Sequence, residues 1–340
     1  MSDKITLNQS YLGISVSAWK VILGFTLFRL FLALILPLTP QEAYYWSWSR
    51  DLALSYFDHP PLASYSIWFT TLIFGQTIFG IKLAAVLWYL GMNIIWATMI
   101  QEMFDNSRQS FWTLLALNAS IVFELYGFVI TPDTPLLFCW TATIYALWKL
   151  VQTEHPKWWY VAGLFMGLAW LGKYSGIMLV PSVLLFTIVS KNQRKWLLTP
   201  HPYLGVLLSI LVFSPVLIWN VQHDWISFAF QGSQRASGMG HWKVKHFGEL
   251  LGSQFFILSP YLFVVVFATL IRYGRKLFTD LEDKLLLLLS SGLVTSVFFI
   301  AVSFRSLVKM NWLAPAYWSL IILGVYHLFQ SSNRFNRMRM

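Results

Sequence analysis

Ten long apolar runs follow one another along the 340 residues of this chain, and they constrain its fold more than any other feature. A helix needs about 20 apolar residues to cross a hydrocarbon core of roughly 30 Å. Runs of about this length occupy residues 19–38, 81–101, 109–128, 132–151, 158–173, 175–190, 203–221, 249–271, 285–304 and 311–330. The runs 158–173 and 175–190 almost touch, so they are either two spans or one kinked segment. The sequence therefore predicts an all-α integral membrane protein, a bundle of about ten transmembrane helices.

The low charge of the chain excludes a soluble enzyme. Only 11% of the residues are charged and 57% are hydrophobic, whereas a soluble domain carries about 25% charge. The single Cys139 excludes a disulfide framework and a cysteine-based zinc site. The net charge of +10 is spread over short connections and forms no continuous basic face, so nucleic acid is not an expected partner.

The distribution of Lys and Arg predicts the orientation. Fifteen of these 24 residues fall in connections on one side of the membrane and eight on the other, with Arg29 inside the first run. Because cytoplasmic loops are enriched in Lys and Arg, we expect both termini in the cytoplasm. The long connections 39–80 and 222–248 then face outward. We expect one membrane domain over residues 1–340, without a separate soluble domain.

Aromatic residues are concentrated in the two long outer connections. Residues 41–50 and 62–74 carry Trp, Tyr and Phe at helical spacing, and residues 223–247 repeat this composition. Amphipathic aromatic rings settle at the headgroup layer of a bilayer. We therefore expect interfacial helices in these outer loops.

Three acids and one histidine on the outer side are the main candidates for a catalytic site. Glu42 follows the first run, residues 58–61 read Asp-His-Pro-Pro, and Asp133 opens the fourth run. Each has a simpler interpretation: Glu42 as a solvated loop acid, Asp58 with His59 as a rigid turn, and Asp133 as a helix cap. Their shared side favours a catalytic site. The carboxylates suit magnesium or manganese, and Asp58 with His59 equally suits zinc.

Basic residues on the same side are suited to phosphate. Lys173, Arg235 and Lys309 have no carboxylate close in sequence, and cations at headgroup level bind phosphate or diphosphate. The alternative is that these side chains only extend to the interface. The sequence has no P-loop, dinucleotide-binding glycine pattern, Gly-x-Ser-x-Gly elbow or His-Glu-x-x-His motif.

Five segments together resemble one family of membrane enzymes. Residues 39–61, 131–136, 163–181, 214–231 and 311–317 are similar to integral-membrane glycosyltransferases of the GT-C fold. The nearest branch is the one related to dolichyl-phosphate-mannose protein mannosyltransferases and bacterial lipid A aminoarabinose transferases. The resemblance covers nearly the whole chain. Many relatives continue into a soluble C-terminal domain, so the resemblance implies a short form.

The resemblance implies an inverting transfer of a sugar from a polyprenyl-phosphate donor to a lipid, glycan or protein acceptor. It implies an active site on the periplasmic face of a bacterial inner membrane. The family's Asp-Glu pair reads Gln41-Glu42 here, which leaves Glu42 as the candidate general base. By the same resemblance, Asp133 and Asp58 are catalytic candidates, and Asp58 with His59 is a candidate for metal contact. The candidate substrate-binding residues are His59, Tyr45, Tyr56, Arg50, Lys173, Arg235 and Lys309.

Two other classes of function remain open at this point. A transporter or lipid flippase would place ionisable residues at the membrane midplane, where only Arg29 is expected. A catalytically silent scaffold with a GT-C-like fold would explain Gln41 and the short length.

Overall fold

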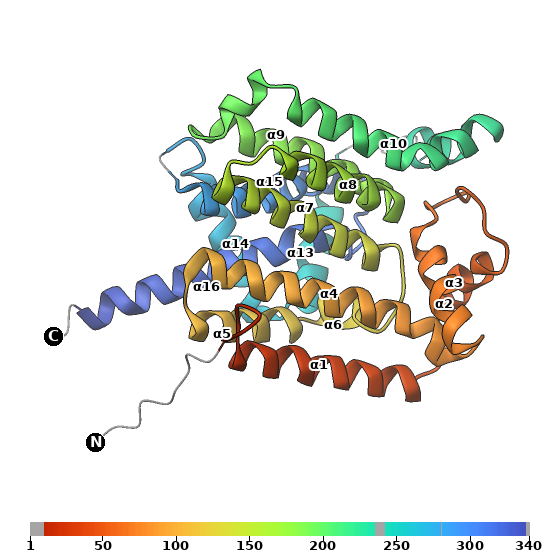
Figure 1. Ribbon diagram of the computed structural model, residues 1–340, viewed down its shortest axis with the longest axis horizontal. Coiled ribbons are helices and arrows are strands. Elements are labelled where there is room, and N and C mark those ends of the chain that lie inside the picture. The colour runs from red at the N-terminus through yellow and green to blue at the C-terminus, as the bar shows by residue number, and fades with distance from the viewer. Residues whose placement is uncertain (1–9, 235–241, 280, 338–340) are drawn as a thin grey trace.

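Helices that run back and forth between two ends make up most of the computed structural model, which describes residues 10–234, 242–279 and 281–337 (Figure 1). The α-helices are α1 (Val16–Ile35), α2 (Pro40–Ser49), α3 (Leu62–Phe74), α4 (Ile78–Phe104), α5 (Ser107–Asn118), α6 (Ile121–Tyr126), α7 (Asp133–Thr153), α8 (Lys157–Gly172), α9 (Leu179–Val189), α10 (His201–Gln222), α11 (Ile226–Ala229), α13 (Val244–Leu258), α14 (Pro260–Gly274), α15 (Asp283–Ser303) and α16 (Ala314–Arg337). Short helical turns are η1 (Tyr174–Met178), η2 (Arg194–Leu198) and η3 (Phe230–Gln234). A small hairpin of β1 (Ser10–Tyr11) and β2 (Ile14–Ser15) precedes α1. The all-helical membrane fold is confirmed, apart from this hairpin.

The number of helices long enough to span a membrane is lower than ten. Among the described residues, α1, α4, α7, α10 and α15 are long and apolar enough, and the bent pair of α13 and α14 would make a sixth. The other predicted runs are helical as well, but most are shorter or interrupted. The run 109–128, for example, breaks between α5 and α6 at Ala119 and Ser120.

The run 249–271 is where the expected span is most altered. The helix axis bends by 118° between its two halves, α13 and α14. Ser259 at the junction has φ +72°, a left-handed conformation that ends α13. Pro260 follows and starts α14, where its missing N–H costs nothing because the first turn has no helical acceptor. The corner was not expected from the sequence, because only Ser259 and Pro260 break the helix and the residues on both sides of them are hydrophobic.

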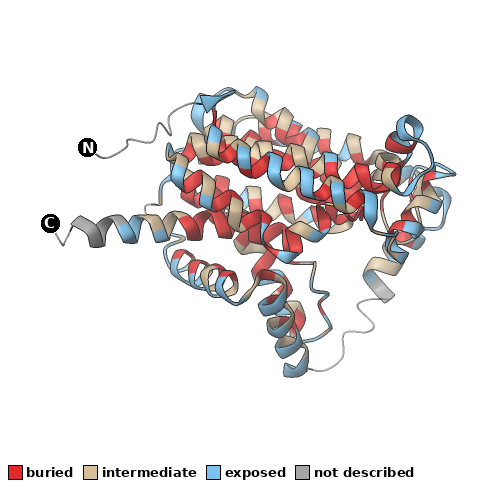
Figure 2. Cartoon of the chain, turned by 90° about the horizontal axis from the view of Figure 1, so that it is seen from below, coloured by how far each residue is buried: buried red, intermediate tan, exposed pale blue. Residues whose placement is uncertain are grey.

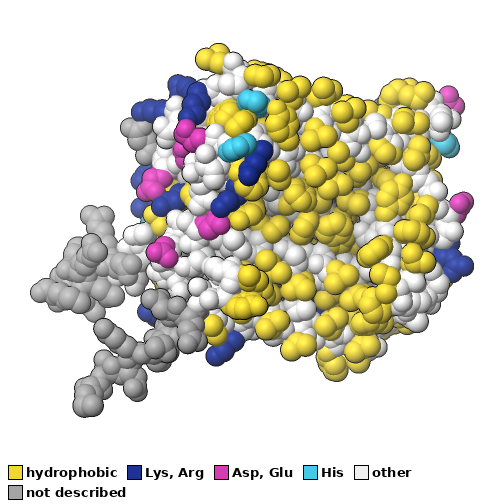
Figure 3. Space-filling view, in the orientation of Figure 1, with side chains coloured by type: hydrophobic (Ala, Val, Ile, Leu, Met, Phe, Trp, Pro, Cys, Tyr) yellow, Lys and Arg dark blue, Asp and Glu magenta, His cyan; other side chains and the backbone are white. Residues whose placement is uncertain are grey.

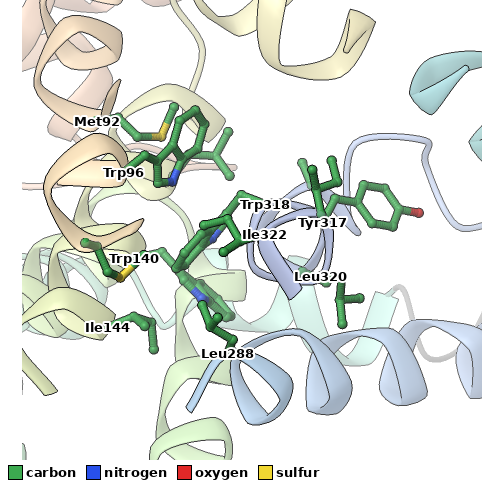
Figure 4. Close-up of a cluster of buried hydrophobic side chains, with 14 of the residues drawn as sticks. Met92, Trp96, Trp140, Ile144, Leu288, Tyr317, Trp318, Leu320 and Ile322 are labelled. Carbon is green, nitrogen blue, oxygen red and sulfur yellow. The ribbon is translucent and has the colours of Figure 1, made fainter. Parts of the chain in front are cut away.

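Three tryptophans form the centre of the bundle. Trp96 of α4, Trp140 of α7 and Trp318 of α16 are fully buried and come together in the cluster of Figure 4. The indole N–H of Trp140 donates to Ser291 Oγ of α15 at 3.0 Å. Tyr317 points the other way, and its hydroxyl donates to Gln254 Oε1 of α13 at 2.6 Å. These bonds satisfy polar atoms that would otherwise be unpaired in the interior.

Charged side chains gather at the two ends of the bundle. The space-filling view shows a wide apolar middle, with Lys, Arg, Asp and Glu at the left and right ends (Figure 3). Figure 2 shows the buried positions on the faces that the helices turn toward one another. The helices α2 and α3 lie across the right-hand end in Figure 1, as the predicted interfacial helices should. On α3, Ile67 and Thr71 are buried on the α4 side, whereas Phe69 is exposed.

Glycines bring α8 and α10 into backbone contact, and we expect a bulky residue there to destabilise the protein. A Cβ on Gly163 would overlap the backbone of Gly205, and Ser209 Oγ donates to the Gly163 carbonyl at 2.8 Å. Gly163→Leu should therefore force the helices apart and lower stability by about 1–3 kcal/mol. The melting temperature in detergent measures this loss. Gly252→Leu is the matched control, since its Cβ would meet no atom within 4 Å; equal melting temperatures for the two variants would contradict the prediction.

Candidate active site

A buried ion pair lies at the end of the bundle that carries α2 and α3. Lys173 Nζ donates to Asp133 Oδ1 at 2.8 Å and to Oδ2 at 2.9 Å. Asn311 Nδ2 donates to Oδ2 of the same carboxylate at 2.8 Å. Asp133 is 4% exposed and Lys173 is 8% exposed. Pro132 and not Asp133 is the N-cap residue of α7, and the Asp133 carboxylate instead accepts from Lys173 and Asn311.

Local structure explains why these residues meet. Asp133 is the first residue of α7, where a negative charge is favoured by the helix dipole. Lys173 directly follows α8 in an extended conformation, with φ −159°. Gly172 lets the end of α8 approach the start of α7, since a Cβ there would be 3.0 Å from the backbone nitrogen of Leu136. The short connection before α16 supplies Asn311.

The Asp58-His59 turn lies nearby and is half-buried. Tyr44 of α2 donates its hydroxyl hydrogen to Asp58 Oδ1 at 3.3 Å. The Gln231 side chain donates to the main-chain carbonyl of Asp58 at 2.6 Å. The ring of Tyr45 meets the ring of His59 edge-on, with the centroids 6.0 Å apart. This turn is therefore held by α2 on one side and by η3 on the other.

Two tyrosines of α2 have raised pKa values, to which the negative charge of nearby acids contributes. Burial raises the pKa of Tyr44 to about 12, and the Asp58 carboxylate adds to that shift. Burial raises the pKa of Tyr45 far above its ordinary value, and the charges of Asp58 and Asp133 follow in importance. Both phenols are therefore neutral at physiological pH and can donate hydrogen bonds.

Glu42, the candidate base, forms a separate buried ion pair. Its two carboxylate oxygens accept from Lys82 Nζ at 3.0 and 2.8 Å, and neither side chain has more than 1% exposure. Glu42 also forms a capping box with Thr39 at the start of α2. The geometry favours a structural role, in which Glu42 fixes α2 onto α4. No feature of the sequence identifies Lys82 as its partner.

The remaining predicted residues fall into different surroundings. Tyr56 stacks on Trp48 with centroids 4.2 Å apart, and its hydroxyl donates to the Trp48 carbonyl at 2.9 Å. Arg50 is exposed and lies over the Trp46 ring at 5.9 Å. Lys309 is exposed. Arg235 lies outside the described residues.

No metal cluster accompanies the two expected ligands in the described part of the chain. Among residues 10–234, 242–279 and 281–337, no group of three or more His, Cys, Asp or Glu side chains is placed to hold a metal ion. Asp58 and His59 would contribute at most two ligands. Structural and catalytic metal sites use at least three protein ligands in most cases. The residues described here do not fit a resident zinc ion.

Sequence reasoning missed two residues of this site. Asn311 contacts Asp133, although 178 positions separate them, and Gln231 contacts the main chain of the Asp58 turn. Both lie in segments that carry the family resemblance, 311–317 and 214–231. Neither carries a charge, and so neither drew attention as a candidate.

Comparison with known proteins finds a family match and a relative over most of the chain. Residues 58–219 match the family described as dolichyl-phosphate-mannose-protein mannosyltransferase. Lipid A galacturonosyltransferase RgtD of Rhizobium johnstonii is 26% identical over 322 residues, covering 92% of this chain and 66% of that protein.

Solved structures of ArnT from Cupriavidus metallidurans have the same fold. The apo structure matches at 20% identity with a TM-score of 0.67, over 91% of this chain and 59% of ArnT. The structure bound to undecaprenyl phosphate matches at 19% identity with a TM-score of 0.70, over 92% and 60%. This chain thus spans about 60% of the length of ArnT and 66% of the length of RgtD. The chain is an integral membrane protein with the GT-C fold of ArnT, and its residues 58–219 match the family model of the dolichyl-phosphate-mannose-protein mannosyltransferases.

Proposed function

We propose that this protein is an inverting glycosyltransferase that moves a sugar from a polyprenyl-phosphate donor to a lipid acceptor on the periplasmic face of the inner membrane. The observation that carries the proposal is the buried ion pair of Asp133 and Lys173 at the same end of an apolar bundle as α2, which contacts the Asp58-His59 turn. The relative RgtD is named for lipid A and galacturonic acid, and one ArnT structure holds undecaprenyl phosphate. These names support a lipid A-like acceptor, an acidic sugar and an undecaprenyl carrier. The resemblance to aminoarabinose transferases adds an amino sugar as a second candidate.

Lys173 is the proposed contact to the donor phosphate. An ammonium group has three N–H donors, and Lys173 uses two of them on Asp133. The third is available to a phosphate oxygen without loss of the ion pair. Negative charge grows on the phosphate as its bond to the sugar breaks, so a cation fixed in a buried site stabilises that charge strongly.

Asp58 is the proposed general base. A base must reach the acceptor hydroxyl, and Asp58 is half-buried, whereas Glu42 is 0% exposed and Asp133 is 4% exposed. Asp58 would take the hydroxyl proton while the acceptor oxygen forms a bond to the anomeric carbon. The bond from that carbon to the phosphate breaks at the same time, its electron pair leaves with the polyprenyl phosphate, and the configuration inverts.

The experiment is a transfer assay with purified protein, undecaprenyl-phosphate-linked galacturonic acid or aminoarabinose, and lipid A. Mass spectrometry of the product and release of undecaprenyl phosphate are the readouts. Wild type should consume donor, and Lys173→Gln should lower kcat/KM about 10²-fold. Lys157→Gln is the control, since this exposed lysine lies at the opposite end. Repeating the assay with EDTA tests the expected divalent cation.

Other outcomes separate the alternatives. Failure of wild type to consume any polyprenyl-phosphate sugar would contradict the proposal. Movement of donor between the leaflets of proteoliposomes without sugar transfer would favour a flippase. Donor binding without movement and without sugar transfer would favour a silent scaffold. Product formed by intact spheroplasts from externally added acceptor checks the periplasmic side.

A further inference from the structure

A groove between α5, α14 and α16 lies at the end of the bundle opposite the candidate active site. It has a volume of about 530 Å³. Its walls are apolar and aromatic, with contributions from Trp112, Tyr261 and Phe329. Arg108 and Asn106 are among its few polar lining residues. Such a groove can accommodate acyl chains against its apolar wall and an anionic group next to Arg108.

A second groove repeats this arrangement on the other flank of α5. It lies between α1 and α5, has a volume of about 380 Å³, and is lined by Phe25 and Phe28 together with Lys20. Gly24 lines the same groove, and a Cβ there would meet no atom within 4 Å. Each groove therefore joins an apolar wall to a single cation.

The cations of both grooves are available for a ligand. Lys20 and Arg108 are exposed, each lies near the first residue of its helix, and neither forms an ion pair with any described residue. No Asp or Glu lines either groove. Arg272 and Lys276 are exposed at the end of α14 and add positive charge at this end. Charge complementarity therefore favours an anionic headgroup over a zwitterionic one.

The position of the grooves determines how a ligand reaches them. The α1 helix starts beside Lys20 and leads toward α2, which carries Tyr44 and Tyr45 of the candidate site. The groove walls belong to the apolar surface that faces lipid, so an occupant arrives from the bilayer. We propose that the two grooves bind anionic phospholipids of the leaflet opposite the candidate active site, with the phosphate on Arg108 in the larger groove and on Lys20 in the smaller.

Equilibrium binding of fluorescent phosphatidylglycerol tests this proposal, with phosphatidylcholine of the same acyl chains as the comparison. Purified full-length protein in a neutral detergent should bind phosphatidylglycerol more tightly. Arg108→Gln should weaken that binding about fivefold, the effect of one interfacial cation. Addition of Lys20→Gln to this variant should weaken the binding further. Lys157→Gln is the matched control, because this exposed lysine at the same end lines neither groove.

A variant that fills the larger groove separates a groove site from general surface charge. Ala116 lines that groove, so Ala116→Phe should reduce binding while every cation stays in place. The melting temperature of each variant checks that it folds. Equal binding of the two lipids by wild type would overturn the proposal, as would full binding by Arg108→Gln or by Ala116→Phe. Displacement by millimolar inorganic phosphate would overturn it in favour of a free-phosphate site.

Discussion

Asp58→Asn is expected to lower kcat of the transfer reaction by about 10²–10⁴-fold, with little change in the melting temperature. Loss of a positioned general base has an effect of this size. The asparagine keeps the shape of the side chain and can still accept the Tyr44 hydrogen bond, and the main-chain carbonyl still accepts from Gln231. The turn should therefore hold its geometry while losing its proton acceptor. Single-turnover kinetics with saturating donor measure the chemical step.

Comparison with Glu42→Gln decides which acid is the base. If Asp58 acts, Glu42→Gln should retain most activity per folded molecule, because Glu42 is fully buried against Lys82. Tyr44→Phe is the control for the hydrogen bond to Asp58, and we expect it to lose no more than about tenfold. Near-normal turnover by Asp58→Asn together with loss of turnover by well-folded Glu42→Gln would assign the base to Glu42 instead.

Breaking the buried pair of Glu42 and Lys82 should destabilise the protein by about 3–5 kcal/mol. Either single substitution, Glu42→Gln or Lys82→Met, leaves one charged group buried without its counter-ion. The double variant leaves no uncompensated charge and should recover most of this loss. Chemical unfolding in detergent measures all three variants. The capping box with Thr39 should also loosen in Glu42→Gln, since its carboxylate accepts the Thr39 N–H at 2.8 Å.

The exposed pair of Lys195 and Glu154 provides the reference for this experiment. Its atoms are also 2.8 Å apart, but the side chains are 51% and 59% exposed. Lys195→Met should change stability by less than about 1 kcal/mol, since water screens such pairs. A double variant of the buried pair that is no more stable than the single variants would mean that packing around α2, and not charge pairing, sets the loss.

Hydrophobicity predicted the positions of the helices because a helix in lipid must satisfy its own backbone. The interfacial helix α2 was also predictable, since Thr39 and Pro40 are typical first residues of a helix. The corner at Ser259 was not predictable, because it depends on one residue in a left-handed conformation between two apolar halves. The break after α5 was missed for a similar reason: Ala119 and Ser120 do not interrupt the apolar pattern.

Sequence reasoning predicted which side of the membrane the site residues occupy, but it did not identify their partners. Asp133 and Lys173 were assigned to one face by counting spans, and the structure brings them together. The contact of Glu42 with Lys82 joins residues 40 positions apart. The periodicity of a sequence indicates which face of a helix a residue occupies. Only the packing of α2 on α4 determines that Glu42 pairs with Lys82. A fully buried acid such as Glu42 and a half-buried acid such as Asp58 therefore looked alike in the sequence.

Main-chain carbonyls provide the anchors between the two outer loops. Ser227 donates to the carbonyl of Tyr56 at 3.1 Å, and Gln231 donates to that of Asp58. A carbonyl is present whatever side chain the residue carries, so these anchors place no demand on the identity of residues 56–58. The hydrogen bonds to the main chain of residues 56 and 58 would therefore survive a change of either side chain, whereas Phe57 also packs against Phe230 of the opposite loop, with ring centroids 4.8 Å apart. The bond from Gln231 thus holds the turn without using the carboxylate of Asp58, the proposed base.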